Sequence, residues 1–466
     1  MRGVWKHKPR PVLLNSWEAC YFKIDEKKLL QLAKAGKDAG IELFVMDDGW
    51  FLGRNDDTSS LGDWEPDPKK LPGGIASLSK KIKALGMDFG LWVEPEMISE
   101  NSNLYKEHPD WAMKIPGHPH SEGRNQCILD LCNPEVRKYV IEEMTRVFSS
   151  GDIRYAKWDM NRIFSDIYAP SLPAERQGET AHRYVLGLYQ IMEELTTRFP
   201  MILFEGCSAG GNRFDLGILC YFPQIWASDN TDALCRTGIQ NSYSYGYPLS
   251  VFTAHVSSCP NHQTLRITPL ETRFQVASFG ILGYECNLKD LSGSDLNAIR
   301  EQIALYKKWR DVFQFGTFYR GTENEDSDSE TLSWTCVSPD GRRAVGLFFR
   351  RLTTPNQSHD WYRPVGLLPD VKYHFYGRNI KYNLKDFGDL VNTVSPVHIK
   401  QGSALQEILS RFVNMDGEKE DLTAYGDTLM LAGIALKPAF AGTGYNSDTR
   451  LFPDFSSRIY FMEAVE

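Results

Sequence analysis

The segment Tyr155-Ala156-Lys157-Trp158-Asp159-Met160-Asn161-Arg162 decides which fold we expect for the whole chain. In a β-strand, the period of two places Lys157, Asp159 and Asn161 on one face and Trp158 and Met160 on the other. Three polar groups near the end of a strand favour a functional site, which a barrel of parallel strands carries at that end. An ammonium group two residues away stabilises an ionised carboxylate, so we expect a depressed pKa for Asp159. A buried Lys–Asp pair that holds a barrel closed explains this segment equally well.

Around this segment, short apolar runs alternate with helical stretches, and most of the runs end in polar or charged residues. We expect strands at residues 12–14, 43–46, 89–93, 127–131, 153–159, 201–204, 224–226 and 251–255. Apolar periodicity and capping residues predict helices at residues 25–40, 75–85 and 180–198, and a further helix that begins at Pro134. The alternation predicts an α/β fold, a (β/α)₈ TIM barrel with its site at the C-terminal rim.

The length of 466 residues exceeds one compact core, so we expect two domains. Helices at residues 271–282 and 295–313 complete the barrel, and the polar residues 323–328 are expected to form a linker. Short alternating runs at residues 332–337, 344–349 and 373–376 predict antiparallel strands beyond it. We therefore predict a catalytic (β/α)₈ barrel at residues 1–321 and a C-terminal antiparallel β-sandwich domain at residues 322–466.

Composition excludes several classes of function. A net charge of -8 without a long basic run argues against nucleic acid, and no apolar run has membrane-spanning length. Nine scattered cysteines and the lack of a signal-peptide pattern predict reduced thiols in the cytoplasm. The chain has no phosphate loop or dinucleotide motif, and the spacing of His255 and His262 matches no zinc motif.

Acidic residues gather at the predicted strand ends: Asp47, Asp48, Glu94, Glu96, Asp159, Glu205, Asp229 and Asp232. Together with Trp17, Trp92 and Trp226, they favour a polyhydroxylated ligand, because carboxylates accept hydrogen bonds from hydroxyls and indoles pack on sugar rings. Glycoside hydrolysis needs one ionised and one protonated carboxyl group. Asp159 beside Lys157 is the better anion, and Asp229 is the better acid because no basic residue adjoins it. Asp232 remains a competitor of Asp229.

Two further groups of residues allow a sugar-binding and a structural interpretation. Asp47 and Asp48 can both reach a ligand where Gly49 lets the chain turn, or they can cap a loop. Arg124 can donate to sugar hydroxyls or form a surface salt bridge.

Six segments in the same order resemble the bacterial α-galactosidases (melibiases) of glycoside hydrolase family 36. They are Asn15-Ser16-Trp17, Asp47-Asp48-Gly49-Trp50, Leu91-Trp92-Val93-Glu94-Pro95-Glu96, residues 157–162, Cys207-Ser208-Ala209-Gly210-Gly211 and residues 226–232. The resemblance runs from about Pro11 to the C-terminus. It implies a retaining hydrolase that acts on terminal α-linked galactose, as in melibiose and raffinose, without a metal or an organic cofactor.

The resemblance also implies roles for single residues. Asp159 is similar to the nucleophile of the family and Asp229 to its general acid/base. Asp47 and Asp48 resemble the pair that holds the 4- and 6-hydroxyls, Lys157 and Arg124 the basic ligands of the ring hydroxyls, and Trp17 and Trp92 the walls of the subsite. Cys207 is expected near the 2-hydroxyl, and Asn161 is expected to support the pocket.

The chain departs from the family in two places. Family members usually carry an N-terminal β-sandwich domain, which contributes oligomer contacts, whereas this chain starts almost at the first strand; a fragment of a longer product and a homo-oligomer both remain open. Ala209 stands where Gly is common, next to the contact for the 2-hydroxyl. The alternatives to an α-galactosidase are therefore an α-N-acetylgalactosaminidase of the same family, a transglycosylase, and a sugar-binding protein without turnover.

Overall fold

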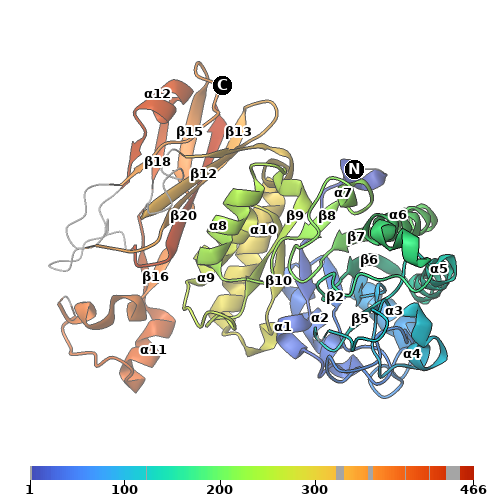
Figure 1. Cartoon of the computed structure of the whole chain (residues 1–466). Helices are drawn as coiled ribbons and strands as arrows, with labels where there is room; N and C mark the ends of the chain where they lie inside the picture. Colours follow the sequence, from blue (N-terminus) through green and yellow to red (C-terminus); the bar gives the residue numbers. More distant parts are fainter. Residues whose placement is uncertain are drawn as a thin grey trace. The chain divides into compact units, whose positions relative to one another are not determined.

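Eight parallel strands close into a barrel in the first part of the chain (Figure 1). The computed structural model describes residues 3–121, 123–321, 330–354, 360–393, 395–418, 420–436 and 452–465. The ring consists of β1 (Leu13–Asn15), β2 (Leu43–Met46), β3 (Asp88–Val93), β6 (Ile153–Trp158), β7 (Leu203–Gly206), β8 (Gln224–Trp226), β9 (Phe252–Ser257) and β10 (Ile281–Glu285). β10 pairs with β1, and this pairing closes the ring. The predicted (β/α)₈ barrel is confirmed.

A helix follows each strand of the ring. These helices are α2 (Glu26–Ala39), α3 (Gly74–Ala84), α5 (Pro134–Ser149), α6 (Thr180–Arg198), α7 (Ile218–Tyr221), α8 (Ala233–Tyr243), α9 (Leu270–Ser278) and α10 (Gly293–Phe315). Local sequence fixes their ends: Asp25 caps α2 by accepting a hydrogen bond from the Lys28 amide, and Gly40 ends it with a φ of 99°. Asn133 caps α5, which begins at Pro134 as predicted.

The identity of two predicted elements was wrong. Residues 127–131 do not belong to the ring: β5 (Cys127–Ile128) pairs antiparallel with β4 (Met97–Ile98) in an excursion between β3 and α5. The eighth strand of the ring is β10 instead. Its first two residues, Ile281 and Leu282, were predicted to belong to a helix at residues 271–282. The helical pattern continues through apolar residues after Ser278, but Gly280 stops the helix against β9, where a Cβ would lie 3.2 Å from the Phe252 carbonyl oxygen.

Side chains inside the ring form a floor below the C-terminal rim. Trp5, Leu13, Leu43, Val45, Tyr155 and Leu203 pack in one buried cluster. Because side chains two apart on a strand share a face, Tyr155 in this floor sets Lys157 on the same inner face, one step nearer the rim. The alternate residue Trp158 packs against Phe222, with 5.8 Å between the ring centroids. The sequence of β6 thus turns Lys157 towards the mouth of the barrel.

The chain divides into two compact units, of which the first holds the barrel. It comprises Met1–Gln240, Ser250–Arg266 and Ala277–Lys308, and the second comprises Asn241–Leu249, Ile267–Val276 and Trp309–Glu466. The predicted linker at residues 323–328 lies outside the described residues, so the predicted boundary between residues 321 and 322 stays a prediction. Among the described residues, no helix has both the length and the apolar character that a membrane span requires.

The second unit contains an antiparallel sheet, as predicted. Its order is β11 (Thr317–Arg320), β12 (Thr331–Val337), β13 (Arg343–Arg350), β20 (Ser456–Ala464), β15 (Lys372–Gly377) and β18 (Asp421–Tyr425). The short pair β14 (Trp361–Tyr362) and β19 (Ile434–Ala435) shares a buried core with this sheet. β16 (Lys381–Asn383) pairs with β17 (Asn414–Asp416), and α11 (Ala404–Phe412) and α12 (Gly426–Leu431) complete the unit.

Candidate active site

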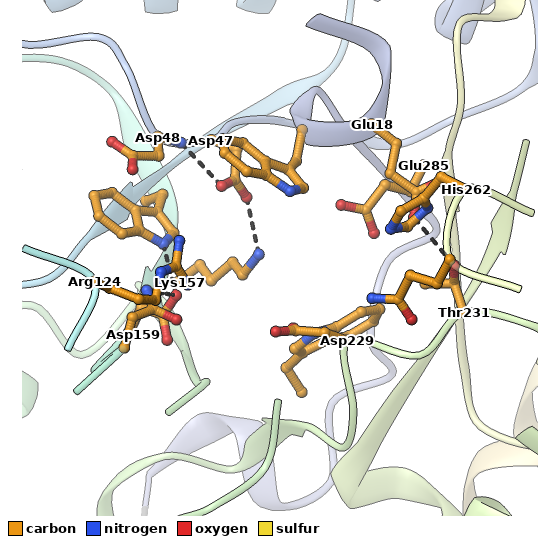
Figure 2. Close-up of a pocket in the computed structure, with 15 residues that line it drawn as sticks. Glu18, Asp47, Asp48, Arg124, Lys157, Asp159, Asp229, Thr231, His262 and Glu285 are labelled. Atoms are coloured by element: carbon orange, nitrogen blue, oxygen red, sulfur yellow. Dashed lines mark hydrogen bonds and ion pairs between the residues drawn. The ribbon is translucent and has the colours of Figure 1, made fainter. Parts of the chain in front are cut away.

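A pocket at the carboxyl ends of the barrel strands brings together most of the residues that the sequence singled out. It is lined by Trp17, Glu18, Asp47, Asp48, Trp92, Arg124, Lys157, Asp159, Asn161, Trp226, Asp229, Thr231, His262, Gln263 and Glu285. Figure 2 shows Asp47, Asp48, Arg124, Lys157 and Asp159 on one side of the pocket and Glu18, Thr231, His262 and Glu285 on the other. Asp229 lies between these two groups. Of the ten predicted site residues, only Cys207 is not part of the lining.

Asp159 directly follows β6 and accepts hydrogen bonds on both carboxylate oxygens. Its Oδ2 accepts from the Trp92 indole at 3.1 Å and from the Asn161 amide at 2.8 Å. Its Oδ1 accepts from the backbone N–H of Met160 at 2.8 Å and of Ser208 at 3.0 Å. Because all of these groups donate, they favour the ionised carboxylate and hold it in one orientation.

The pKa of Asp159 lies below its ordinary value despite complete burial. Burial alone would raise the pKa, but the Lys157 ammonium and hydrogen bonds from the Cys207 thiol, the Ser208 amide and the Trp92 indole outweigh it. The direction agrees with the prediction. The direct ion-pair partner of Lys157 is nevertheless Asp47, whose Oδ2 lies 2.9 Å from Nζ, and not Asp159.

The loop after β7 contacts both candidate acids through its backbone. Ser208, Ala209, Gly210 and Gly211 have φ values of 103°, 46°, 76° and 93°. These left-handed conformations are costly for Ser and Ala, and such strain is concentrated at functional sites. At Gly210 a Cβ would lie 2.6 Å from the Asp229 backbone nitrogen, so only glycine permits this close approach. Cys207 itself is buried, and its thiol donates a hydrogen bond to the Asp159 carboxylate.

Asp229 has the electrostatic character opposite to that of Asp159. Burial and the charge of Asp159 raise its pKa above the ordinary value, although Lys157 and the Trp226 indole oppose the shift. The indole N–H donates to Asp229 Oδ1 at 2.7 Å and so fixes the carboxyl group beside the Trp226 ring. A carboxyl group with a raised pKa at the edge of a pocket suits a proton donor.

Asp232, the competitor that the sequence left open, lies outside the pocket lining. Its carboxylate pairs with Arg266 Nη1 at 2.7 Å and accepts from the Thr264 hydroxyl at 2.6 Å. Burial opposes ionisation, but these partners and the Cys235 amide lower the pKa of Asp232. Asp232 thus has a structural arrangement, and the geometry favours Asp229 as the acid.

Asp47 and Asp48 follow the end of β2, and both line the pocket. Besides Lys157, Asp47 Oδ2 accepts from the Asn15 amide at 2.7 Å. Asp48 is held by the guanidinium of Arg54, with Nε to Oδ1 at 3.0 Å and Nη2 to Oδ2 at 2.8 Å. Arg54 is fully buried, so it holds the Asp48 carboxylate in place from below the pocket surface.

The far side of the pocket contains acids that the sequence analysis did not identify as site residues. Glu285 ends β10 and lies 2.9 Å from His255 Nδ1; burial opposes its ionisation, but His255 lowers the pKa of Glu285. Burial and Glu285 raise the pKa of Glu18 to about 8. Glu18 lies 3.2 Å from His262 Nδ1. The signal for Glu285 was present in the sequence, since Ile281-Leu282-Gly283-Tyr284 is an apolar run that ends in an acid.

A barrel mouth with indole rings, hydroxyl-binding acids and two carboxyl groups of opposite pKa shift is typical of (β/α)₈ barrels of the glycoside hydrolase class. Residues 1–316 match the family model described as Melibiase, and residues 331–462 match that of the glycosyl hydrolase family 36 C-terminal domain. The chain belongs to glycosyl hydrolase family 36, as the six sequence segments predicted.

Characterised and solved relatives agree with this assignment. The chain is 47% identical to the α-galactosidase AgaA of Geobacillus stearothermophilus over 379 residues, which cover 81% of this chain and 52% of AgaA. It is 48% identical to Mel36A of Lactobacillus acidophilus over 373 residues, which cover 80% of this chain and 50% of Mel36A. The crystal structure of AgaA superposes with a TM-score of 0.84 at 42% identity, covering 100% of this chain and 57% of AgaA. The chain spans about half the length of the curated relatives that it matches.

Proposed function

We propose that the chain is the catalytic part of a retaining α-galactosidase that releases terminal α-linked D-galactose from sugars such as melibiose and raffinose. Its family membership supports this proposal, as do the structures of AgaA variants in complex with raffinose and stachyose. The observation that carries it is that one pocket holds two carboxyl groups in unlike surroundings: Asp159 accepts hydrogen bonds from Trp92 and Asn161, which favour its anion, whereas burial beside Asp159 raises the pKa of Asp229.

In the proposed double displacement, Asp159 attacks the anomeric carbon while Asp229 protonates the oxygen of the leaving group. The bond to the leaving sugar breaks, and galactose is transiently bonded to Asp159. Asp229, now ionised, takes a proton from water, which attacks the same carbon and releases galactose with its original anomeric configuration. In retaining enzymes the two carboxyl groups lie roughly 5–5.5 Å apart.

The other lining residues are proposed to bind the galactose ring. Asp47 and Asp48 accept hydrogen bonds from the 4- and 6-hydroxyls, while Lys157 and Arg124 donate to ring hydroxyls. Trp17 and Trp92 form the walls of the subsite, and Asn161 orients Asp159 through its 2.8 Å hydrogen bond. Cys207 acts from beneath, through its thiol hydrogen bond to Asp159.

The decisive experiment is the Asp159→Gly variant of the 466-residue chain, assayed with p-nitrophenyl α-galactoside with and without azide. We expect the rate to fall by at least about 10³-fold, because a residue essential to the chemistry is removed. Azide occupies the space of the lost carboxylate and should restore turnover, with β-galactosyl azide as the product. Near-normal activity without azide would exclude Asp159 as the nucleophile.

A matched pair of variants tests the acid. Asp229→Asn should lose most activity on substrates with a poor leaving group, whereas Asp232→Asn should reduce stability and leave the chemical step intact. Parallel assays with a 2-hydroxyl and a 2-acetamido chromogenic substrate identify the sugar. Turnover of only the acetamido substrate would contradict the proposed specificity for galactose. Binding of galactose without turnover of either substrate would contradict the proposed hydrolase activity.

A further inference from the structure

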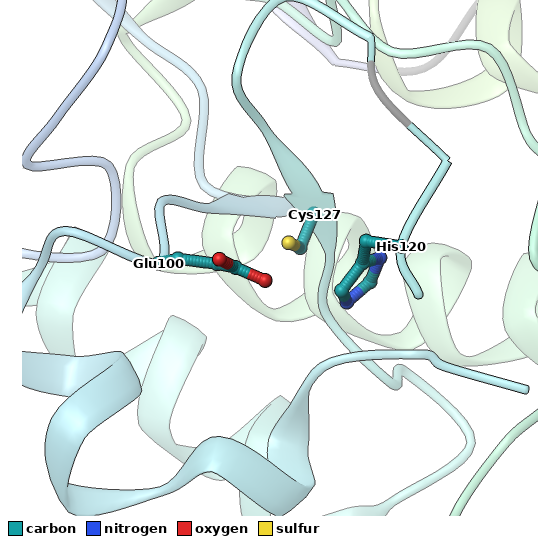
Figure 3. A group of neighbouring side chains, drawn as sticks. All are labelled: Glu100, His120 and Cys127. Atoms are coloured by element: carbon teal, nitrogen blue, oxygen red, sulfur yellow. The ribbon is translucent and has the colours of Figure 1, made fainter. Parts of the chain in front are cut away.

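A second group of potential ligands lies in the excursion between β3 and α5, outside the lining of the active-site pocket. Glu100, His120 and Cys127 each present one ligand atom, and these atoms lie within 4.8 Å of one another. Figure 3 shows the three side chains converging from separate parts of the backbone. In the part of the chain that the structure describes, no other group of three or more His, Cys, Asp or Glu side chains has such an arrangement.

The backbone holds two of these ligands in a fixed relation. Cys127 begins β5 and is opposite Ile98 of β4 in the antiparallel register, and Glu100 follows two residues after that strand. Cys127 is buried and Glu100 is exposed, so one ligand anchors the group to the protein interior and the other faces solvent. Glu100, His120 and Cys127 also line a common surface cavity, which gives an ion a route of entry.

Of the three side chains, His120 has a buried ring nitrogen that lacks a hydrogen-bond partner among the described residues. Its side chain is only 11% exposed, and Nδ1 lies 3.5 Å from Asp166 Oδ2. The other ring nitrogen, Nε2, is buried and has no hydrogen-bond partner within the described ranges. A carboxylate beside one imidazole nitrogen, with the other nitrogen available, is the arrangement that orients histidine ligands of metals. Asp166 is itself held by Arg162 at 2.9 Å and by the Ser121 hydroxyl at 2.6 Å.

We propose that Glu100, His120 and Cys127 bind one Zn²⁺ ion, with water as the fourth ligand. Zinc accepts sulfur, nitrogen and oxygen ligands together in a tetrahedral arrangement, and three protein ligands leave the fourth position to water. On binding, the Cys127 sulfur forms a bond to the ion and its proton passes to solvent. Neither the protein nor the metal changes its oxidation state.

The ion would fix the loop that presents Arg124 to the active-site pocket. Arg124 and Asn125 lie between two of the ligands and have left-handed φ values of 51° and 56°. Bonds from the metal to His120 and to Cys127 would restrain the backbone on both sides of Arg124 and Asn125. This consequence rests on the proposed role of Arg124 in sugar binding, whereas metal binding itself does not.

Metal binding to the 466-residue chain is the direct test, with Zn²⁺ and Co²⁺ as the probes. We expect one equivalent per chain by competition with a chromophoric chelator. The Co²⁺ form should show a near-ultraviolet sulfur-to-cobalt charge-transfer band and the intense visible bands of four-coordinate cobalt. Asp166→Asn should weaken binding by about 10–100-fold, the usual effect of losing a carboxylate behind a histidine ligand.

Each ligand variant has a neighbouring control. His120→Asn, Cys127→Ser and Glu100→Gln should each reduce the affinity at least tenfold, whereas His118→Asn, Cys132→Ser and Glu107→Gln should leave it unchanged. Glu100→Gln alters an exposed side chain and therefore reports on the site even where a core variant fails to fold. Binding that survives Glu100→Gln and His120→Asn, or a Co²⁺ spectrum without the charge-transfer band, would overturn the proposal. These outcomes do not depend on turnover, so they are separate from those of the activity assays.

Discussion

Glu94 offers the sharpest quantitative test of the electrostatics beneath the pocket. Its side chain is completely buried, and burial together with the charge of Asp159 raises its pKa to about 8. Its Oε1 accepts a hydrogen bond from the backbone N–H of Asn161, and its Oε2 accepts one from the Gln126 side-chain nitrogen at 3.2 Å. Ionisation of Glu94 is therefore penalised in the folded chain and not in the unfolded chain.

The magnitude follows from the difference between about 8 and the ordinary value of 4.5. At about 1.4 kcal/mol for each pH unit, the full effect on the free energy of unfolding is about 5 kcal/mol. A raised carboxyl pKa means that the folded chain binds the proton more tightly. The contribution is thus complete below pH 4.5 and is lost progressively as the pH rises to about 8.

The Glu94→Gln variant removes this titration at little structural cost. The side-chain carbonyl of the new glutamine can still accept from the backbone N–H of Asn161. Its new amide can donate to Gln126 Oε1, a buried acceptor that has no partner among the described residues, once the Gln126 side-chain amide turns over. As the pH rises from 5 to 9, the parent chain loses this contribution and the variant does not. The difference in the free energy of unfolding should therefore shift by about 4 kcal/mol in favour of the variant.

Urea unfolding followed by tryptophan fluorescence, at several pH values from 5 to 9, measures this difference. Glu107→Gln, which alters an exposed glutamate, serves as the control and should give a curve parallel to that of the parent chain. If the Glu94→Gln curve also runs parallel to the parent over this range, Glu94 ionises freely in the folded chain and the reasoning is refuted.

Three further predictions follow from the same site. The pH profile of kcat/KM should be bell-shaped, because the lowered pKa of Asp159 sets the acidic limb and the raised pKa of Asp229 sets the alkaline limb; a single limb would contradict the assignment of two roles. Ala209→Gly should stabilise the chain by about 1 kcal/mol in urea unfolding, because glycine relieves the left-handed strain, and a loss of stability would contradict that strain. Arg54→Met should cost about 3–5 kcal/mol of unfolding free energy and raise KM, since Asp48 is left buried without its partner; an unchanged KM would show that Arg54 does not position Asp48 for the substrate.

The sequence predicted the parts of the site that depend on local periodicity. Alternation along residues 155–161 predicted that Lys157, on β6, and Asp159, just after it, share the pocket side, and the barrel pattern placed Asp47 and Asp229 at the same rim. The ion pair between Lys157 and Asp47 joins residues 110 apart in sequence, so no local pattern could identify it.

The errors arose where local patterns were ambiguous. Residues 127–131 have the apolar character of a barrel strand but form part of an excursion, because a short apolar run does not reveal its pairing partner. Ile281 and Leu282 fit the preceding helical pattern, so β10 and its terminal Glu285 were missed. Cys207 does not line the pocket and contacts Asp159 instead, so its expected place near the 2-hydroxyl stays a prediction.

Closure of the ring through β1 and β10 has a consequence for the newly made chain. Glu18, just after the earliest strand, and Glu285, at the tip of the latest one, face each other only when these two strands have paired. During synthesis, a ribosome-bound chain shorter than residue 285 lacks one wall of the cavity, even with the seven other strands assembled. Ribosome-stalled chains of increasing length can be tested for binding to an immobilised galactose mimic. The shortest chain that binds gives the length at which β1 and β10 have paired and the ring has closed.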